Sequence, residues 1–505
     1  MNVGQILTLQ AGKFPERTAL VFEGSRFTYD EFNRRSNRFA DYLLRSGLTK
    51  GDRVAALLFN SPPAVETFFG TAKAGGVFTP VNFRLAAEEV FYILDHSDAR
   101  YFIFGEEFSP LVGKIRPRLP KVEYFICHGG SAPPDTAEYE IVLRASSPEE
   151  PGEAVAEDDE CQMLYTSGTT GRPKGALLTH GNLLWNLVNT LLGREDQPGE
   201  ASLICGPLYH AAPLNNHFLI RVTLGGTSIL MKHFDARQAM EIIAREKVNV
   251  VSGAPALYHL LLNLPDVQNY DTRSVTRCTA GAAILPDETK LRLLKLFPNA
   301  RGVYDVYGAT EASPTIAVLK ASDSLRKTAC VGPAAQFVEL KIVDDGDREL
   351  PCGAVGEIIL RGPNIMKGYY KDPEATAEAL RGGWLHTGDM GRLDEEGFLY
   401  IVDRKKDMII SGGENVYPRE IEEVLYRHPK IQDAAVIGVP SSLWGEAVKA
   451  FVVLRPGEKM SGEEVVEYCR EHLAGYKKPK FVAFVDSLPR NPSGKVIKTK
   501  LRADA

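Results

Sequence analysis

The 505-residue chain lacks the features that mark several common classes of protein. Its seven cysteines are odd in number and have no Cys-x-x-Cys spacing, which excludes a fully paired disulfide framework and gives no zinc signature. No apolar run approaches the roughly 18–20 residues that a membrane helix needs, and the N-terminal residues lack the basic start and apolar core of a secretory signal. A formal net charge of −6 provides no basic face for nucleic acid. We therefore expect a cytoplasmic protein with reduced cysteines and without a transmembrane segment or a nucleic-acid partner.

The order of apolar and turn-forming segments predicts an α/β protein of more than one domain. A length of 505 residues exceeds one ordinary core. Residues 28–31 (Thr-Tyr-Asp-Glu) form a capping-box start for a helix, and residues 54–59 then predict a buried strand. This alternation continues to about residue 307 and favours largely parallel sheets covered by helices.

A change of pattern divides the remainder of the chain. From about residue 331, short strands separated by Gly, Pro and Asp predict a small antiparallel or barrel-like subdomain. A dense charged run, residues 403–407, then precedes helical and strand-like segments typical of a compact α+β unit. We place the domain boundary at this run, which gives an N-terminal domain of residues 1–402, a hinge at 403–406 and a C-terminal domain of residues 407–505.

The most informative segment is residues 165–175, which read Tyr-Thr-Ser-Gly-Thr-Thr-Gly-Arg-Pro-Lys-Gly. It lies between an apolar run and a helix expected from His180, which predicts a strand–loop–helix connection. Its glycines allow close backbone approach, successive N–H groups form an anion-binding concavity, and Lys174 adds a point charge. A lone Gly-rich turn is more often a solvated surface loop, but this combination favours a nucleotide triphosphate. The residues expected to bind its phosphates are Thr166, Ser167, Gly168, Thr169, Thr170 and Lys174.

This segment resembles the phosphate-loop signature of the adenylate-forming superfamily, which includes acyl-CoA synthetases, adenylation domains of peptide synthetases and beetle luciferases. It differs from the kinase and GTPase loop, which has four residues between its glycines and ends in Gly-Lys-Ser/Thr. Further segments match the superfamily in its order, so the resemblance covers nearly the whole chain. It implies a large adenylation domain of two helix-flanked, largely parallel sheets with a small β-barrel-like subdomain, and a mobile, small α+β domain joined by a hinge.

Residues 304–311 (Tyr-Asp-Val-Tyr-Gly-Ala-Thr-Glu) resemble the superfamily's Tyr-Gly-x-Thr-Glu segment. The resemblance implies an aromatic side chain, Tyr307, stacked on adenine and a hydroxyl, that of Thr310, donating to the α-phosphate. Glu311 is a hard oxygen ligand suited to Mg²⁺. The other nucleotide-binding residues implied, three of which also form a wall of the acyl pocket, are Asp305, Gly308, Gly281, Ala282 and Ala283.

Segments nearer the C-terminus complete the resemblance. Asp389, in a Thr-Gly-Asp turn, matches the superfamily's ribose-binding aspartate. A carboxylate suits this role, since it can accept hydrogen bonds from two vicinal hydroxyls. Arg404 would contact the ribose or a phosphate, and Lys406 occupies the hinge position, where residues absorb the backbone change of a domain rotation. Gly412 and Gly413 lack side chains and would line the pantetheine tunnel of CoA, although a tight turn before a helix explains them as well.

Residues 489–496 resemble the loop that carries the adenylation lysine, here Lys495. Its Gly- and Pro-shaped tip allows the ammonium to be delivered to a remote site and withdrawn. A lysine aimed at the attacked phosphate stabilises the developing charge, an effect worth roughly 3–4 kcal/mol for comparable single donors. Lysines near a C-terminus are otherwise solvated, so the motif alone distinguishes Lys495.

The acyl pocket should involve residues 207–216, in which His210 matches a histidine of many acyl- and aryl-CoA synthetases, although a lone histidine is more often structural. No aspartate occurs in residues 207–234, and a buried substrate ammonium would require one, which argues against an amino acid. No arginine occurs in residues 207–220, which weakens a dicarboxylate, although Arg221 lies just beyond. We favour a medium- or long-chain fatty acid, with an aromatic acid (coumarate- or benzoate-like) as the runner-up.

The resulting prediction is an ATP-dependent carboxylic acid–CoA ligase that forms acyl-CoA through an acyl-adenylate. Its expected ligands are ATP, Mg²⁺, coenzyme A and a small-molecule carboxylic acid, and a homodimer is the candidate assembly. Three alternatives stay open: an acyl-AMP ligase serving a carrier protein, a luciferase-like oxygenase, and a degenerate nucleotide-binding module. The expected catalytic residues are Lys495, Glu311, His210 and Thr310, with Glu311 also the metal ligand.

Overall fold

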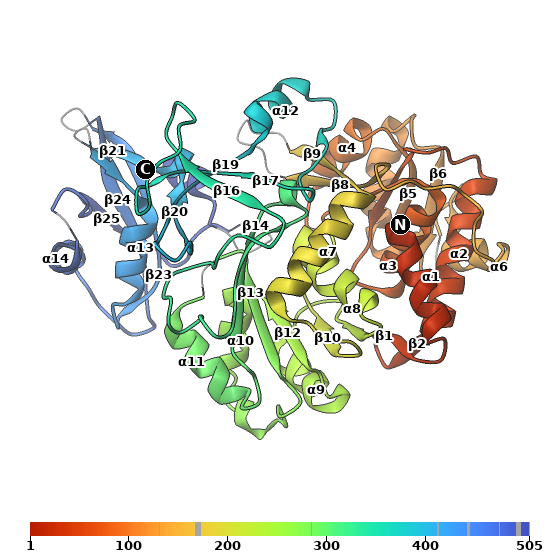
Figure 1. Ribbon diagram of the computed structural model, residues 1–505, viewed down its shortest axis with the longest axis horizontal. Coiled ribbons are helices and arrows are strands. Elements are labelled where there is room, and N and C mark those ends of the chain that lie inside the picture. The colour runs from red at the N-terminus through yellow and green to blue at the C-terminus, as the bar shows by residue number, and fades with distance from the viewer. Residues whose placement is uncertain are drawn as a thin grey trace. The chain divides into compact units, whose positions relative to one another are not determined.

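The computed structural model (Figure 1) describes residues 1–130, 132–166, 173–283, 285–411, 414–441, 445–473, 475–490 and 496–503. None of the helices in these ranges is both long enough and apolar enough to cross a membrane. The contacts divide the chain into two compact units, Met1–Leu340 with Leu360–Leu385 and Lys341–Ile359 with His386–Ala505. The hinge expected at 403–406 falls inside the second unit, so the domain limits 1–402 and 407–505 stay predictions.

Two eight-stranded sheets form the framework of the first unit in the described ranges. In the first sheet every pairing is parallel except those of the edge strands β15 and β2. The carboxyl ends of its inner strands therefore meet at one edge, which is where α/β proteins bind ligands. In spatial order its strands are β15 (Thr315–Leu319), β14 (Val303–Gly308), β13 (Arg277–Gly281), β12 (Val250–Gly253), β10 (Ala201–Ile204), β11 (Thr227–Leu230), β1 (Thr18–Phe22) and β2 (Ser25–Thr28).

The second sheet is parallel from β7 to β8, and β9 and β18 then continue it antiparallel. In spatial order its strands are β18 (Gly368–Tyr369), β9 (Lys174–Thr179), β8 (Glu160–Thr166), β4 (Val77–Pro80), β3 (Arg53–Leu57), β5 (Ala99–Gly105), β6 (Tyr124–His128) and β7 (Ala137–Glu138).

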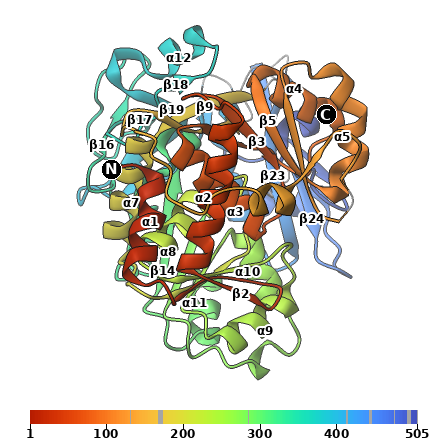
Figure 2. The same cartoon turned by 90° about the vertical axis from the view of Figure 1, so that its right-hand side faces the viewer.

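Helices cover both faces of each sheet because successive strand residues point to opposite sides. In β3, Val54 and Ala56 join the central core, whereas Ala55 and Leu57 join an outer core. The central core includes α1, α2 and α3, which lie side by side in Figure 2. The helices of the central layer are α1 (Val3–Lys13), α2 (Tyr29–Arg45), α3 (Pro62–Ala74), α6 (Tyr139–Arg144), α7 (His180–Arg194) and α8 (Leu219–Thr223); the outer helices are α4 (Ala87–His96), α5 (Ser109–Ile115), α9 (Ala236–Glu246), α10 (Pro255–Leu262) and α11 (Asp287–Leu296); α12 (Pro373–Ala379) follows β18.

The second unit is mainly antiparallel. Its first sheet has the order β16–β17–β19–β20, and its second has β22–β21–β24–β23 with β25 parallel to β24. Helices α13 and α14 share one core with the second sheet, and α15 packs on the core of its other face. The elements are β16 (Glu339–Val343), β17 (Gly356–Arg361), β19 (Leu385–Leu393), β20 (Leu399–Arg404), β21 (Ile409–Ser411), β22 (Glu414–Val416), α13 (Pro418–Tyr426), β23 (Ile431–Ser441), β24 (Gly445–Leu454), α14 (Gly462–His472), β25 (Phe481–Phe484) and α15 (Lys498–Ala503).

This architecture confirms the expected α/β class with two helix-flanked, largely parallel sheets, followed by small sheets and an α+β part. The capping box is also confirmed: Thr28 accepts from the backbone N–H of Glu31, and the Glu31 side chain accepts from the backbone N–H of Thr28. Local sequence therefore determined where α2 begins.

Candidate nucleotide- and acyl-binding site

Strands β8 and β9 bring the two ends of the predicted phosphate segment together. The strands are antiparallel, with Thr166 opposite Lys174. The connection is therefore a β-hairpin, and the predicted strand–loop–helix connection is wrong, because the buried apolar residues 176–178 extend β9 before α7 begins at His180. The predicted phosphate-binding residues that lie outside the described residues are Ser167, Gly168, Thr169 and Thr170.

Hydroxyl groups bind the carboxylate of Glu311, and a lysine lies beside them. Tyr369 donates its hydroxyl hydrogen to Glu311 Oε1 at 2.9 Å, and Thr166 donates to the same oxygen at 3.5 Å. Lys174 Nζ lies 5.3 Å from the ring centroid of Tyr369 and 3.6 Å from Asp372 Oδ2. Burial, assisted by the Glu311 charge, raises the pKa of Tyr369 well above its ordinary value, so its hydroxyl keeps the proton that it donates. The fold thus gathers Thr166, Lys174 and Glu311.

Tyr369 and Asp372 are site residues that sequence reasoning missed. Tyr369 belongs to β18, which pairs antiparallel with β9 and so lies beside the phosphate segment. Asp372 follows it and also caps α12 by accepting from the N–H of Ala375 at 3.0 Å. A Gly-Tyr dipeptide was the only local signal, and it carries no chemistry until the strand pairing is known.

Glu311 fits the Mg²⁺ ligand that the sequence predicts. In the part of the chain that the structure describes, its side-chain partners are hydroxyl groups, with no lysine or arginine paired to it. No cluster of three or more His, Cys, Asp or Glu side chains in that part could enclose an ion. Mg²⁺ is usually held by one or two carboxylates together with substrate phosphates. A carboxylate that has no lysine or arginine partner among the described residues, close to the lysine predicted to bind phosphate, has that character.

The adjacent carboxyl ends of β13 and β14 carry further predicted nucleotide-binding residues. The two strands are parallel, so their ends lie side by side, and Thr310 follows in a short 3₁₀ turn, Thr310–Ala312. A side chain at Gly308 would place its Cβ 1.9 Å from the carbonyl oxygen of Pro314, so this position requires glycine. Ala282 has a φ of 67°, which is unusual for a residue with a side chain. The residues at these strand ends are Gly281, Ala282, Ala283, Tyr307 and Gly308.

Asp305 lies on β14, and its carboxylate is paired within the protein. Lys290 Nζ of α11 lies 2.7 Å from Asp305 Oδ2, and both side chains are buried. Burial raises the pKa of Asp305 to about 6, although the Lys290 charge opposes the rise. A nucleotide group that binds this carboxylate would therefore share it with Lys290.

His210 lies after β10 and just before a π-helical segment, Ala212–Phe218, a conformation that is frequent at functional sites. Burial lowers the pKa of His210 to about 4, so the imidazole is neutral at neutral pH. Among the described residues its Nε2 has no hydrogen-bond partner, and the same is true of the neighbouring Tyr209 hydroxyl. Buried polar atoms are rarely left without a partner. These orphaned atoms are suited to polar groups of a bound substrate.

An aromatic cluster extends from Tyr209 across the carboxyl ends of both sheets. Phe83, after β4, lies with its ring centroid 5.0 Å from Tyr209 and 4.7 Å from Phe59, which follows β3. Phe59 in turn lies 4.4 Å from His233, which follows β11. Edge-to-face packing of this kind provides flat apolar surfaces next to residues 207–216, which we call the acyl segment.

The polar residues of the acyl segment bind other parts of the protein. Asn215 exchanges hydrogen bonds with Gln162 at 3.0 and 3.2 Å, and Asn216 donates to Thr315 at 2.8 Å. Arg221, which left a dicarboxylate substrate open, is fully buried and forms ion pairs with Asp196 and with Glu200. Arg221 is the arginine that the sequence left as a possible partner for a second substrate carboxylate. Its charge is already paired within the protein.

In the second unit the two predicted ribose-binding residues contact each other. Antiparallel pairing of β19 and β20 places Asp389 opposite Arg404, and Arg404 Nε lies 2.6 Å from Asp389 Oδ1. Asp389 is buried, whereas Arg404 is 40% exposed in its side chain, which leaves room for a ligand at the arginine. The pair is a ready acceptor and donor for hydroxyl or phosphate groups.

Of the remaining predicted residues, the structure describes only the backbone of Lys406. The backbone of Lys406 lies in a short 3₁₀ turn, Lys405–Asp407. Gly412, Gly413 and Lys495 fall outside the described residues, although Arg490 and Val496 form an antiparallel bridge, so the two ends of the lysine segment are side by side.

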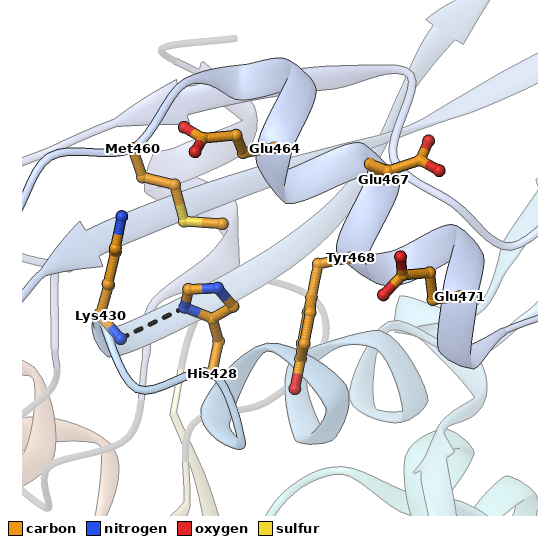
Figure 3. A pocket seen from close by; sticks show the side chains of 7 residues that line it. All are labelled: His428, Lys430, Met460, Glu464, Glu467, Tyr468 and Glu471. Atoms are coloured by element: carbon orange, nitrogen blue, oxygen red, sulfur yellow. Dashed lines mark hydrogen bonds between the residues drawn. The ribbon is translucent and has the colours of Figure 1, made fainter.

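A surface pocket of about 240 Å³ opens on α14 in the second unit (Figure 3). Figure 3 shows Glu464, Glu467 and Glu471 along the helix, with the side chain of Tyr468 beside that of His428. The His428 and Tyr468 rings meet edge to face at 4.6 Å. None of the residues predicted to bind ATP, CoA or the acid lines this pocket.

Comparison with known proteins shows to which family the chain belongs. Residues 7–370 match the AMP-binding enzyme family, and residues 420–495 match the AMP-binding enzyme C-terminal domain. The chain belongs to the AMP-binding enzyme family. This AMP-binding enzyme is 40% identical to feruloyl-CoA synthase from Amycolatopsis sp, covering 97% of this chain and 96% of the relative. It is 36% identical to a long-chain-fatty-acid–CoA ligase from Mycobacterium tuberculosis, covering 99% and 98%.

Solved structures of similar proteins agree with this AMP-binding enzyme over its whole length. An anthranilate CoA ligase in complex with anthranoyl-AMP superposes with a TM-score of 0.93 at 26% identity, covering 100% of this chain and 97% of the other. ATP-bound MatB from Rhodopseudomonas palustris has a TM-score of 0.91 at 31% identity, covering 100% and 99%. This AMP-binding enzyme is therefore an adenylate-forming acyl-CoA ligase, an AMP-forming acid–thiol ligase that uses ATP and CoA as substrates.

Proposed function

We propose that this ligase activates a hydrophobic monocarboxylic acid and that an aromatic acid is the first candidate. The observation that carries the proposal is the commitment of Arg221 to Asp196 and Glu200. Residues 207–221 contain no other lysine or arginine, so this segment offers no cation to a second carboxylate and no anion to a substrate ammonium.

Two further observations support an aromatic acid. The rings of Phe59, Phe83 and Tyr209 provide flat apolar surfaces near the neutral His210. A 40% identical relative is named feruloyl-CoA synthase, and a structure with a TM-score of 0.93 contains anthranoyl-AMP. The fatty acid favoured by the sequence is the second candidate, supported by the 36% identical long-chain-fatty-acid–CoA ligase.

In the first half-reaction a carboxylate oxygen of the acid attacks the α-phosphorus of ATP, and pyrophosphate leaves. Lys174 and Thr166 would hold the phosphates, and His210 would orient the acid through its unpaired Nε2. Lys495 would neutralise charge that develops on the attacked phosphate. Glu311 would hold Mg²⁺, which supplies additional positive charge at the phosphates when it is bound.

In the second half-reaction the CoA sulfur attacks the acyl carbon of the adenylate. The carbon–oxygen bond to AMP breaks, the thiol proton is released, and the thioester and AMP form. Rotation of the C-terminal domain about Lys406 would withdraw Lys495 and bring Gly412 and Gly413 to the pantetheine, while Asp389 holds the ribose. Location in the cytoplasm and a homodimer complete the proposal; size-exclusion chromatography with light scattering tests the latter.

A panel of acids tests the proposal. Release of AMP would be measured with ferulate, benzoate, octanoate, palmitate, malonate and glycine, each with and without CoA. We expect the highest kcat/KM with an aromatic acid, CoA-dependent AMP release, and values at least about 100-fold lower with malonate and glycine, because an unpaired buried charge costs about 3–5 kcal/mol. Preference for palmitate would replace the first candidate by the second. Comparable activity with malonate would overturn the monocarboxylate assignment, and release of pyrophosphate without CoA-dependent AMP would indicate an acyl-AMP ligase.

A further inference from the structure

One outer helix, α4, contacts both ends of the phosphate segment. The hydroxyl of Tyr92 donates to the carbonyl oxygen of Pro173 at 3.1 Å. One turn later, His96 Nδ1 lies 2.8 Å from the hydroxyl oxygen of Tyr165. Tyr165 immediately precedes Thr166, and Pro173 immediately precedes Lys174. A single rigid element thus fixes the chain next to both described phosphate-binding residues.

The His96 imidazole is held by its neighbours on several sides. It stacks on Tyr92 of the same helix at 5.3 Å, as residues four apart on a helix do. It meets Tyr165 edge to face at 5.8 Å and Tyr370 at 6.1 Å. Its carbonyl oxygen accepts from Lys371 Nζ at 3.2 Å. These contacts restrict the rotation of the His96 ring and so stabilise its hydrogen bond with Tyr165.

The protonation states of both groups are compatible with a hydrogen bond from Tyr165 to His96. Burial, assisted by the Lys371 charge, lowers the pKa of His96, so the ring is neutral at neutral pH. Burial raises the pKa of Tyr165 far above its ordinary value, so its hydroxyl keeps its proton. With both groups neutral, the Tyr165 hydroxyl can donate to His96 Nδ1 when the ring proton is on Nε2, and this is the arrangement that the proposal adopts.

We propose that His96 is a positioning residue for ATP: by accepting the Tyr165 hydroxyl, it fixes Thr166 and Lys174 relative to each other while Tyr92 holds Pro173. The proposal rests on the proposed function, since it concerns how the same site meets the triphosphate. Protein groups that are already held in position lose less conformational freedom when ATP binds to them. Loss of this bond should therefore weaken ATP binding without altering the chemistry of the bound complex.

The test compares KM and kcat for ATP, the acid and CoA in four variants. His96→Leu and Tyr165→Phe should each raise the KM for ATP about fivefold, the effect of one ordinary hydrogen bond of about 1 kcal/mol, while kcat and the KM values for acid and CoA change less than twofold. His96→Asn should stay near wild type, because its Oδ1 can accept where Nδ1 did. Tyr124→Phe is the matched control: its hydroxyl donates to Ser46 at 2.9 Å at the far side of the same sheet.

The double variant His96→Leu/Tyr165→Phe distinguishes one shared bond from two separate defects. If the two residues act through one bond, the double variant should be no worse than either single variant. Wild-type KM values for ATP in both single variants, or equal losses for all three substrates, would overturn the positioning role. A wild-type protein that releases no pyrophosphate with any acid of the panel would instead overturn the proposed function itself.

Discussion

Two acidic residues of one segment, Asp305 and Glu311, differ in how the protein treats their charge. Asp305 is buried with Lys290 Nζ 2.7 Å away, and its pKa is raised to about 6. Glu311 is only partly buried and is bound by hydroxyl groups of Thr166 and Tyr369 in the described part of the chain. We call these the Asp305 pair (Asp305 with Lys290) and the Glu311 cluster (Glu311, Thr166 and Tyr369).

The difference suggests different roles for the two charges, structural for Asp305 and functional for Glu311. A carboxylate that already has a buried lysine adds little attraction for another cation. Hydroxyl groups, in contrast, orient a carboxylate and leave its charge uncompensated. We therefore expect the Glu311 cluster to keep a negative charge available for a metal ion at the phosphates, and the Asp305 pair to act mainly by tying β14 to α11.

The largest effect should follow from removing the charge of the Glu311 cluster. Glu311→Gln keeps the size of the side chain and can still accept from Tyr369, but it loses the negative charge. Metal-assisted neutralisation is worth several kcal/mol, so we expect ATP–pyrophosphate exchange to fall at least about 100-fold with little change in Tm. Glu123→Gln, which alters an exposed ion pair with Arg100, should leave exchange unchanged. If Glu311→Gln lowers exchange less than tenfold, the charge of Glu311 is not needed for activity. The contrast drawn between Glu311 and Asp305 would then be wrong.

Features that depend on neighbouring residues were predictable from the sequence. The capping box at Thr28 and the alternation of strands and helices gave the fold class, because caps and periodicity act within a few residues. The helix expected from His180 is present, but strand β9 before it was missed, because the short apolar run of residues 176–178 does not distinguish a strand from a loop that leads into a helix.

Features that depend on distant partners were not predictable. The sequence identified Glu311 by its motif, but Tyr369, which donates to it, arrives through the pairing of β18 with β9. Arg221 was ambiguous as a substrate ligand until its pairs with Asp196 and Glu200 were known. A motif names the residue types at a site, whereas the compensation of their charges is a property of the tertiary fold.

A smaller, pH-dependent effect should mark the Asp305 pair. Because the pKa of Asp305 is raised from 3.8 to about 6, the folded state holds a proton that the unfolded state has already lost in this window. Its stabilising contribution is complete below the unfolded pKa and is lost as pH rises through about 6. Relative to Asp305→Asn, which does not titrate, the wild type should lose about 1–3 kcal/mol of unfolding free energy between pH 4 and pH 7, as measured from urea midpoints.

An exposed aspartate provides the control for this pH dependence. Arg237 lowers the pKa of Asp266 through a hydrogen bond, so the difference between wild type and Asp266→Asn should change in the opposite direction with pH. If the difference in unfolding free energy between wild type and Asp305→Asn stays constant from pH 4 to pH 7, the pKa of Asp305 is not raised by burial. The contrast with Glu311 would then rest on activity alone.

The smallest effect should come from Tyr369→Phe, which removes one hydroxyl from the Glu311 cluster and leaves its ring beside Lys174. A hydrogen bond to a charged group is worth about 1.5–3 kcal/mol when nothing replaces it. Because Thr166 still binds the carboxylate, we expect a smaller effect, with kcat/KM for ATP falling about fivefold. The matched control is Tyr139→Phe, because that hydroxyl also donates to a carboxylate, that of Glu66, at 3.1 Å and away from the predicted site; it should not affect exchange. Combined with Glu311→Gln, the Tyr369→Phe change should have almost no further effect, since the hydroxyl acts only by orienting the charge that the first substitution removes. A full additional fivefold loss in the double variant would show that Tyr369 acts on ATP by itself, and the Glu311 cluster would then contain two independent ligands.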